Sequence, residues 1–358
     1  MSKLLSIIIP TYNMEALLPR CLDSLLVPDA LERIEAMVVN DGSKDGSLTI
    51  ANSYKERFPS AVTVIDKPNG NYGSTINAAL PVAQGKYIRI LDSDDCVRSD
   101  SLIRFLDALE NLETDMAITH FTVLHEDGSK ELTKYNDYGR EPFEYGKTYD
   151  LDQVLEQGYI KYFLMHGLTY RTQLLRDIDY RQTEGISYTD TEWCCYPVFK
   201  ASTITFLDID LYQYNMARDG QTMDPKVIAR SLSQMEKMIR QLIRFFETFD
   251  TANLSETRLS FLRRYYANRI RFLCKCHLVD TPHDLFDADH FEELDRYLME
   301  ACRRNGFDQV RLYPDNKIIR CDLLKFWHRH HRRPRVWFEK LNAFLNRIMT
   351  FLYVKIFK

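Results

Sequence analysis

Alternation of strand-length apolar runs with segments of helical period is the feature that most constrains the fold of this chain. Between residues 4 and 124, short runs rich in Ile, Val and Leu are each followed by turn residues and then by a helical stretch. In the runs Ser6–Ile9 and Met37–Val39 hydrophobicity is continuous rather than alternating, which is typical of parallel strands covered on both faces. The pattern predicts a doubly wound α/β domain with a mostly parallel sheet.

The same pattern predicts the individual elements. The predicted strands are residues 4–10, 34–40, 62–65, 87–91 and 116–124, and the predicted helices are residues 15–26, 47–58, 74–83 and 101–109. The following stretch, residues 125–215, is expected to complete a substrate cleft and to end in a strand at residues 204–211, whereas residues 225–305 are helical in character. We therefore expect an α/β domain of residues 1–220, a helical domain of residues 221–320 and a basic amphipathic tail of residues 321–358.

Composition narrows the class of protein. With 358 residues, 45% of them hydrophobic, the chain can bury more than one domain core. A net charge of -4 provides no overall attraction for nucleic acid. The eight cysteines lack CxxC spacing, which favours free buried thiols in a reducing cytosol. The N-terminus leads directly into a strand-like run rather than a signal peptide, and no run of about 18 apolar residues occurs. We expect a cytoplasmic protein without a membrane span.

Polar residues at the ends of the predicted strands form the candidate ligand site, because parallel α/β sheets bind ligands beyond the carboxyl ends of their strands. The four strand ends read Pro10-Thr11-Tyr12-Asn13, Asn40-Asp41-Gly42-Ser43, the glycine-bearing loop Lys67–Ser74, and Leu91-Asp92-Ser93-Asp94-Asp95. Each of these stretches, taken alone, is also compatible with an ordinary turn or helix cap. Their joint arrangement at one edge of a sheet favours a binding site.

The fourth strand end carries three carboxylates, Asp92, Asp94 and Asp95. Carboxylates crowded at one place repel each other unless a hard cation lies between them. A Mg²⁺ or Mn²⁺ ion bridging Asp94 and a diphosphate would remove that repulsion, and it would also stabilise a diphosphate leaving group.

Three of these blocks, Ser6–Asn13, Val39–Ser47 and Gly85–Asp95, resemble in order and spacing the motifs of family 2 of the inverting glycosyltransferases. The resemblance covers roughly residues 3–215 and is strongest over the first 110. It implies a catalytic domain of the GT-A fold in residues 1–220, which binds a nucleotide sugar, normally a UDP-sugar.

The resemblance also assigns roles to residues. Those implied to bind the donor are Pro10, Thr11, Tyr12 and Asn13 around the nucleotide, Asp41 at the base, Asn69, Gly73 and Asn77 in the third-strand loop and its helix, and Asp92 with Ser93 after the fourth strand. Asp92 and Asp94 form the DxD motif, with Asp94 as the direct ligand of Mg²⁺ or Mn²⁺. In the third-strand loop, Asn71 replaces the family's second Gly, and Ile76 stands where Arg often precedes Asn77.

An inverting transfer needs a carboxylate that takes the proton of the acceptor hydroxyl. Family members place it in a Glu-Asp pair that opens a helix, and here Thr189 replaces the Glu, so Asp190 is the candidate and Glu192 the reserve. The alternative for Asp190 is a helix cap. Arg218 resembles a clamp over the diphosphate in a mobile loop, and an ordinary surface arginine is the alternative.

Other features have weaker assignments. The Gln-x-x-Arg-Trp signature of processive synthases is absent, which favours addition of one sugar to a glycan or lipid-linked acceptor of the cell surface. His166 is more typical of a core or surface histidine than of a substrate contact. Cys274-Lys275-Cys276-His277 does not have the spacing of common zinc sites.

The tail from Lys325 to Lys358 contains nine Lys/Arg and three His against one acid, Glu339, interleaved with many aromatic and aliphatic residues. This composition is typical of a helix at the inner face of a membrane, but it also suits a helix packed on the protein body, and RNA binding is a weaker option. The alternative to an enzyme is a noncatalytic glycosyltransferase-like subunit that binds a partner or a membrane. A sugar-phosphate nucleotidyltransferase would need a Gly-rich N-terminal signature that is not present, and homo-oligomerisation is left open.

Overall fold

The computed structural model describes residues 3–135, 143–216, 231–307, 310–311 and 322–333. The chain divides into two compact units, one formed by Met1–Gln221 with Asp250–Phe261 and the other by Thr222–Phe249 with Leu262–Lys358. The predicted domain boundaries at residues 220 and 320 lie outside the described residues, so they remain predictions.

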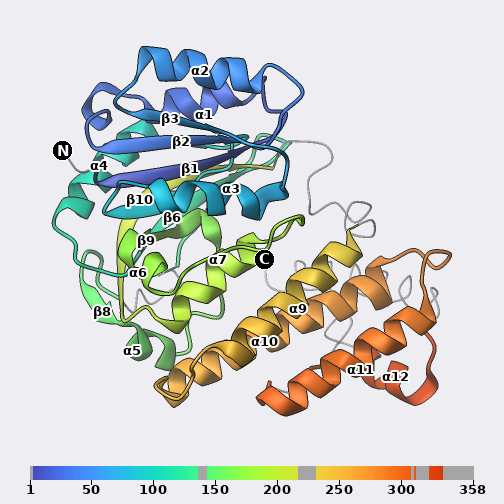
Figure 1. The fold of residues 1–358 in the computed structure, drawn as a ribbon. Coiled ribbons are helices and arrows are strands. Elements are labelled where there is room, and N and C mark those ends of the chain that lie inside the picture. Colours follow the sequence, from blue (N-terminus) through green and yellow to red (C-terminus); the bar gives the residue numbers. More distant parts are fainter. Residues whose placement is uncertain (1–2, 136–142, 217–230, 308–309, 312–321, 334–358) are drawn as a thin grey trace, which may run out of the picture. The chain divides into compact units, whose positions relative to one another are not determined.

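The first unit is built on a ten-stranded mixed sheet (Figure 1). The strand order is β3-β2-β1-β4-β9-β6-β10-β5, with β7 paired to β6 and β8 to β10. Neighbours from β3 to β4 are parallel, as are β6 and β10, whereas β9 lies antiparallel between β4 and β6. The strands are β1 (Leu5–Thr11), β2 (Ile34–Asn40), β3 (Val62–Asp66), β4 (Tyr87–Ile90), β5 (Cys96–Val97), β6 (Met116–Leu124), β7 (Lys130–Thr133), β8 (Thr148–Asp150), β9 (Leu168–Arg171) and β10 (Thr203–Asn215).

Helices cover the sheet because its central strands are apolar on both faces. Every residue of β1 and β2 is buried, as their continuous hydrophobicity predicts. The described helices that lie wholly within this unit are α1 (Leu18–Leu25), α2 (Ser47–Arg57), α3 (Asn71–Ala79), α4 (Ser99–Glu110), α5 (Leu151–Glu156), α6 (Thr172–Asp177) and α7 (Asp190–Cys195), with short 3₁₀ turns at Pro28–Ala30, Leu80–Val82, Met165–Gly167 (η3) and Tyr196–Phe199.

Several helix boundaries differ from those predicted, and proline explains two of them. The helix predicted from residue 15 begins at Leu18, with Pro19 in its first turn, where a missing N–H costs nothing. The helix predicted to reach residue 83 ends at Ala79, because Pro81 cannot donate the next intrahelical hydrogen bond and a 3₁₀ turn follows. The predicted α/β fold itself is confirmed.

The second unit is helical, as predicted for the C-terminal region. It contains α9 (Leu232–Thr248), most of α10 (Glu256–Lys275), a π-helical turn at Cys276–Asp280, α11 (Ala288–Asn305) and α12 (Leu323–His330). Its core includes the rings of Phe246, Tyr266 and Phe307, whose centroids lie 5.1–5.2 Å apart.

Two further expectations concern thiols and membranes. The seven cysteines that the structure describes are all free. Within the described ranges, no helix combines the length and the hydrophobicity needed to cross a bilayer.

Candidate active site

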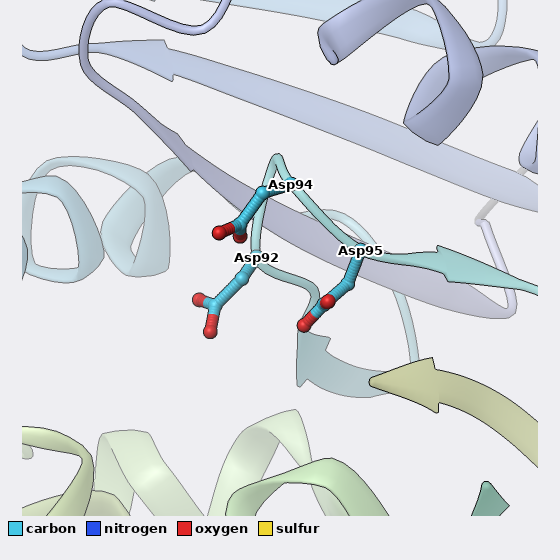
Figure 2. A group of neighbouring side chains, drawn as sticks. All are labelled: Asp92, Asp94 and Asp95. Carbon is cyan, nitrogen blue, oxygen red and sulfur yellow. The ribbon is translucent and has the colours of Figure 1, made fainter. Parts of the chain in front are cut away.

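Three carboxylates meet at the carboxyl end of β4. Ligand oxygens of Asp92, Asp94 and Asp95 all lie within 4.8 Å of one another, and Figure 2 shows the three side chains on the turn that follows the strand. Because β1, β2 and β4 are parallel neighbours, this turn shares an edge of the sheet with the ends of β1 and β2. In the part of the chain that the structure describes, this is the one group of His, Cys, Asp or Glu residues arranged closely enough to hold a metal ion.

Asp95 differs from the other two acids because the protein interior holds it. Its side chain is buried and accepts hydrogen bonds from the hydroxyl of Tyr212 and from the backbone N–H of Asn215 at 2.7 Å. Burial, followed by the charges of Asp92 and Asp94, raises the pKa of the Asp95 carboxyl well above its ordinary value. Asp92 and Asp94 are only half-buried, so they are the members of the group better placed to meet a ligand.

A tyrosine that the sequence did not single out contacts this group. The hydroxyl of Tyr72, on α3, donates to Oδ1 of Asp92 at 2.8 Å and also lies 3.7 Å from the sulfur of Met165. Burial, followed by the charges of Asp92, Asp190 and Asp94, raises the pKa of Tyr72 well above its ordinary value. Tyr72 therefore stays protonated and remains a donor at neutral pH.

Asp190 lies near enough to Tyr72 and Tyr214 for its charge to affect both tyrosines. It is the first residue of α7 and is half-buried, and its charge raises the pKa of Tyr72. The pKa of Tyr214 rises to about 12 because of burial and then the charges of Asp95, Asp92, Asp94 and Asp190. The N-cap of α7 is Thr189, and it has no side-chain capping bond. Asp190 thus lies inside the helix rather than at the cap position, beside the tyrosines that border the acidic group.

Glu192, the reserve candidate for the base, is fully buried. Its carboxylate accepts from the backbone N–H and the hydroxyl of Thr183, at 2.7 and 2.6 Å, and from the hydroxyl of Tyr196 at 3.4 Å. Burial raises the pKa of Glu192 to about 7, although these hydrogen bonds act to lower it. A carboxyl held in this way positions the chain around Thr183 and is poorly placed to meet an acceptor.

The segment that Glu192 holds is also bonded to α3. The Nδ2 group of Asn77 donates to the carbonyl of Gln182 and to Glu184, both at 2.9 Å, and its Oδ1 accepts from the N–H of Gln182 at 2.8 Å. Gly73 lies against the same segment, since a Cβ atom there would be 2.3 Å from the carbonyl oxygen of Thr183. These contacts link the helix that carries Tyr72 to the segment that leads into Asp190.

The residues after β1 and β2 are bonded to each other. Asn13, with a φ of 55°, donates its backbone N–H to the hydroxyl of Ser43 at 3.0 Å and accepts from the N–H of Lys44 at 2.7 Å. Thr11 is buried and its hydroxyl donates to the carbonyl of Ile9, whereas the ring of Tyr12 is 46% exposed. Tyr12 is therefore an exposed aromatic residue directly after the end of β1.

Ser93, which lies between Asp92 and Asp94 in the sequence, contacts Pro10 on β1. The hydroxyl of Ser93 is buried and donates to the carbonyl of Pro10 at 2.8 Å. This bond joins the turn after β4 to β1 and so holds Asp92 and Asp94 at the sheet edge.

Asp41, a buried acid directly after β2, forms an ion pair with the half-buried Lys67. Its Oδ1 accepts from Nζ of Lys67 at 2.7 Å, from the N–H of Gly70 at 2.9 Å and from the hydroxyl of Ser74 at 3.3 Å. The Nδ2 group of Asn69 donates to the backbone carbonyl of Asp41 at 3.0 Å. Among the described residues, all these contacts to the carboxylate use Oδ1, which leaves Oδ2 as an acceptor.

The strand that precedes the acidic group, β4, carries a buried arginine. Arg89, on β4, donates through Nη2 to the carbonyl of His166 at 2.7 Å, while its Nε and Nη1 have no hydrogen-bond partner among the described residues. Burial lowers the pKa of Arg89 to about 10. Burial and the charge of Arg89 lower the pKa of His166 to about 3, so its imidazole is neutral at physiological pH and serves as a packing group against Tyr212 and Tyr214.

The remaining sequence predictions concern Arg218, the C-terminal tail and the stretch Cys274–His277. Arg218 and residues 334–358 of the tail lie outside the described residues. In the second unit, His277 is buried with its Nε2 3.1 Å from Oε1 of Glu236, an ion-pair distance, and no zinc site forms around Cys274 and Cys276 within the described chain.

Comparison with known proteins identifies the family of this chain. The model of glycosyl transferase family 2 matches residues 6–178, which carry the ends of β1, β2 and β4. The chain belongs to glycosyltransferase family 2. It is 29% identical over 325 residues to the uncharacterized glycosyltransferase EpsJ of Bacillus subtilis, a match that spans 89% of this chain and 92% of EpsJ. The family relationship shows that the protein is a glycosyltransferase.

Other family 2 relatives match over shorter stretches. The chain is 37% identical over 118 residues to the poly(ribitol-phosphate) β-glucosyltransferase of Bacillus spizizenii, which is 32% of this chain but only 18% of that enzyme.

Among solved structures, S. aureus TarS residues 1–349 in complex with UDP-GlcNAc superposes with a TM-score of 0.51 at 20% identity, over 88% of this chain and 94% of that one. This likeness confirms the GT-A fold that the sequence motifs implied.

Proposed function

We propose that this family 2 glycosyltransferase transfers a single sugar, with inversion, from a UDP-sugar to a glycan or lipid-linked acceptor in the synthesis of a cell-surface polysaccharide. The proposal is carried by the acidic group that includes Asp92 and Asp94, and the hydrogen bond from Tyr72 to Asp92 and the charge of Asp190, which acts on the same tyrosine, support it. The names of its relatives support the substrate class, because one acts on poly(ribitol-phosphate) and the solved TarS structure holds UDP-GlcNAc.

The donor nucleotide is proposed to lie over the ends of β1 and β2. The exposed ring of Tyr12 offers a face on which a base can stack, and Oδ2 of Asp41 can accept a hydrogen bond from a base N–H. Pro10, Thr11 and Asn13 shape this pocket through their backbone. Asn69, Gly73 and Asn77 hold the neighbouring loop and helix, and Arg218 is proposed to close over the diphosphate.

The acidic group has the chemistry of a site for Mg²⁺ or Mn²⁺. Both ions prefer carboxylate oxygens, and Asp92 and Asp94 supply such donors beside a third acid that is already committed to Tyr212 and Asn215. We assign Asp94 as the direct ligand and Asp92 as the second. A divalent cation here would neutralise the negative charge that develops on the departing diphosphate.

Asp190 is proposed as the general base. As the acceptor hydroxyl oxygen bonds to the anomeric carbon, Asp190 takes the hydroxyl proton, and the bond from that carbon to the diphosphate oxygen breaks, with its electron pair leaving on UDP. Attack from the face opposite the nucleotide inverts the anomeric configuration. Tyr72 keeps Asp92 oriented during this step.

We further propose that the enzyme works in the cytoplasm at the inner face of the membrane, with the basic aromatic tail as its contact. The composition of residues 325–358 supports this placement, and nucleic acid is not an expected partner. Whether two copies associate does not enter the mechanism.

Calorimetric titration with UDP and with GDP, each with and without Mn²⁺, tests the proposal. Metal-dependent binding of UDP should be abolished by Asp94→Ala. It should be preserved in Asp100→Ala, which removes an exposed carboxylate from α4. Absence of nucleotide binding under every condition would refute the donor site, and binding indifferent to Mn²⁺ and to Asp94→Ala would refute the metal.

A further inference from the structure

The second unit contains a cavity of about 640 Å³ where α11 ends and α12 begins. Its apolar wall includes Met299, Phe307, Val310 and Leu324. The volume lies within the roughly 300–1,000 Å³ that is usual for small-molecule sites. Neither the family 2 match at residues 6–178 nor the proposed active site involves these residues.

The polar part of the cavity lining is cationic. Arg303, Arg311 and Lys325 line it together with His328, whereas Asp322 is the one acid among the described lining residues. The carboxylate of Asp322 already serves as the N-cap of α12, since its Oδ1 accepts from the N–H groups of Leu324 and Lys325 at 3.2 and 3.3 Å.

Two of these cations are not neutralised by any residue that the structure describes. Arg303 and Lys325 are exposed and form no ion pair with any residue in the described ranges. By contrast, neighbouring Arg304 pairs with Glu247, and His328 lies 2.9 Å from Asp295. Two cations that no described residue neutralises, beside an apolar wall, favour a ligand with an anionic group and a hydrocarbon part.

We propose that this cavity binds an anionic membrane phospholipid, with the phosphate at Arg303 and Lys325 and an acyl chain along the half-exposed Met299 and Val310. Inorganic phosphate would use the cations but leave the apolar wall in water. Residues 334–358 of the same chain are a poor occupant, because they carry five Lys/Arg against one acid and would be repelled. Their basic and aromatic composition instead suits the same anionic lipid surface.

The inference does not rest on the proposed sugar transfer, so it is tested without donor or acceptor. Full-length protein is titrated with water-soluble dihexanoyl phosphatidylglycerol, and dihexanoyl phosphatidylcholine serves as the uncharged counterpart with the same chains. We expect saturable binding of the anionic lipid and at least about tenfold weaker binding of phosphatidylcholine. Shortening the chains to dibutyryl should also weaken binding at least about tenfold, because each buried CH₂ contributes to affinity.

A charge-matched pair of variants isolates the cavity. Arg303→Gln with Lys325→Gln should weaken lipid binding about thirtyfold, since each cation near a lipid phosphate contributes appreciably to affinity. Arg296→Gln with Arg329→Gln removes the same charge from the same two helices at exposed positions that do not line the cavity, and it should leave binding within about twofold. Unfolding midpoints of both variants establish that they fold.

Several outcomes would overturn the assignment. These are the absence of saturable binding, equal weakening by both double variants, or inorganic phosphate binding as tightly as the lipid. Tighter binding of a short isoprenyl phosphate would assign the cavity to a different lipid. Displacement of bound lipid by a synthetic peptide of residues 334–358 would make the tail the occupant.

Discussion

The hydroxyl of Tyr72 donates a hydrogen bond to Oδ1 of Asp92 at 2.8 Å, and this contact joins α3 to the acidic turn after β4. Asn77, also on α3, is hydrogen-bonded to Gln182 in the segment before α7. The same helix is therefore bonded both to Asp92 and to the segment that leads into Asp190. The relative placement of the proposed metal site and the proposed base therefore depends on α3.

Replacing Tyr72 by Phe removes the donor to Asp92 and keeps the ring. We expect kcat/KM for the UDP-sugar to fall about tenfold, with weaker binding of Mn²⁺ in the presence of UDP, because hydrogen bonds to charged groups contribute roughly 1.5–3 kcal/mol. Tyr54→Phe is the matched control, since the hydroxyl of Tyr54 donates to Oδ1 of Asp23 at 2.7 Å away from the site. Equal activity of the two variants would remove Tyr72 from the mechanism.

Replacing Asp190 by Asn removes the proposed base while preserving the shape of the side chain. Turnover should drop by about 10²–10⁴, which is the usual contribution of a general base. UDP affinity measured by calorimetry should stay within about twofold, because Asp190 is not assigned to the donor. Loss of UDP binding together with activity would instead indicate a role in the donor site.

Because of Glu192, the free energy of unfolding should fall as the pH rises. Its pKa in the folded protein is about 7, above the ordinary value of 4.5, so the folded state binds the proton more tightly than the unfolded state does. The resulting stabilisation is fully present below pH 4.5 and is lost as pH rises through about 7, with an amplitude of roughly 3 kcal/mol.

The measurement for Glu192 is the free energy of unfolding in urea at several pH values. Glu192→Gln cannot titrate, so its stability should decline less between pH 4.5 and 7 than that of the wild type. Glu56→Gln, at an exposed position of α2, should follow the wild-type curve. A Glu192→Gln curve parallel to the wild type would contradict the raised pKa.

Gly73 should not tolerate a side chain. Although alanine is the better helix former, its Cβ would lie 2.3 Å from the carbonyl oxygen of Thr183, and that backbone would have to shift. We expect Gly73→Ala to lower the free energy of unfolding by about 1–3 kcal/mol, measured in urea. A variant as stable as the wild type would show that the segment at Thr183 moves freely.

Much of the fold follows from local pattern. The runs Leu5–Thr11 and Ile34–Asn40 are mostly apolar and buried at every position, as is typical of strands covered on both faces of a parallel sheet. Because parallel strands end at one edge, the polar residues that follow them, including Asp41 and Asp92, could be assigned to that edge from the sequence alone.

Long-range contacts were not predictable in this way. Tyr72 and Asp92 are 20 residues apart, and Glu192 reaches Thr183 through a turn that has no periodic pattern. Asp95 reads in the sequence like its neighbours, yet Tyr212 and Asn215, more than 100 residues away, hold it inside the protein.

The sequence by itself therefore determined the α/β class, the sheet edge that carries the polar residues and the family, because these depend on periodicity and on short motifs. Tertiary structure decided which carboxylates face outward and which are held inside, since burial and hydrogen-bond partners come from segments distant in the chain. Three aspartates in one turn and two acids in α7 thus acquire different roles from the same carboxylate chemistry.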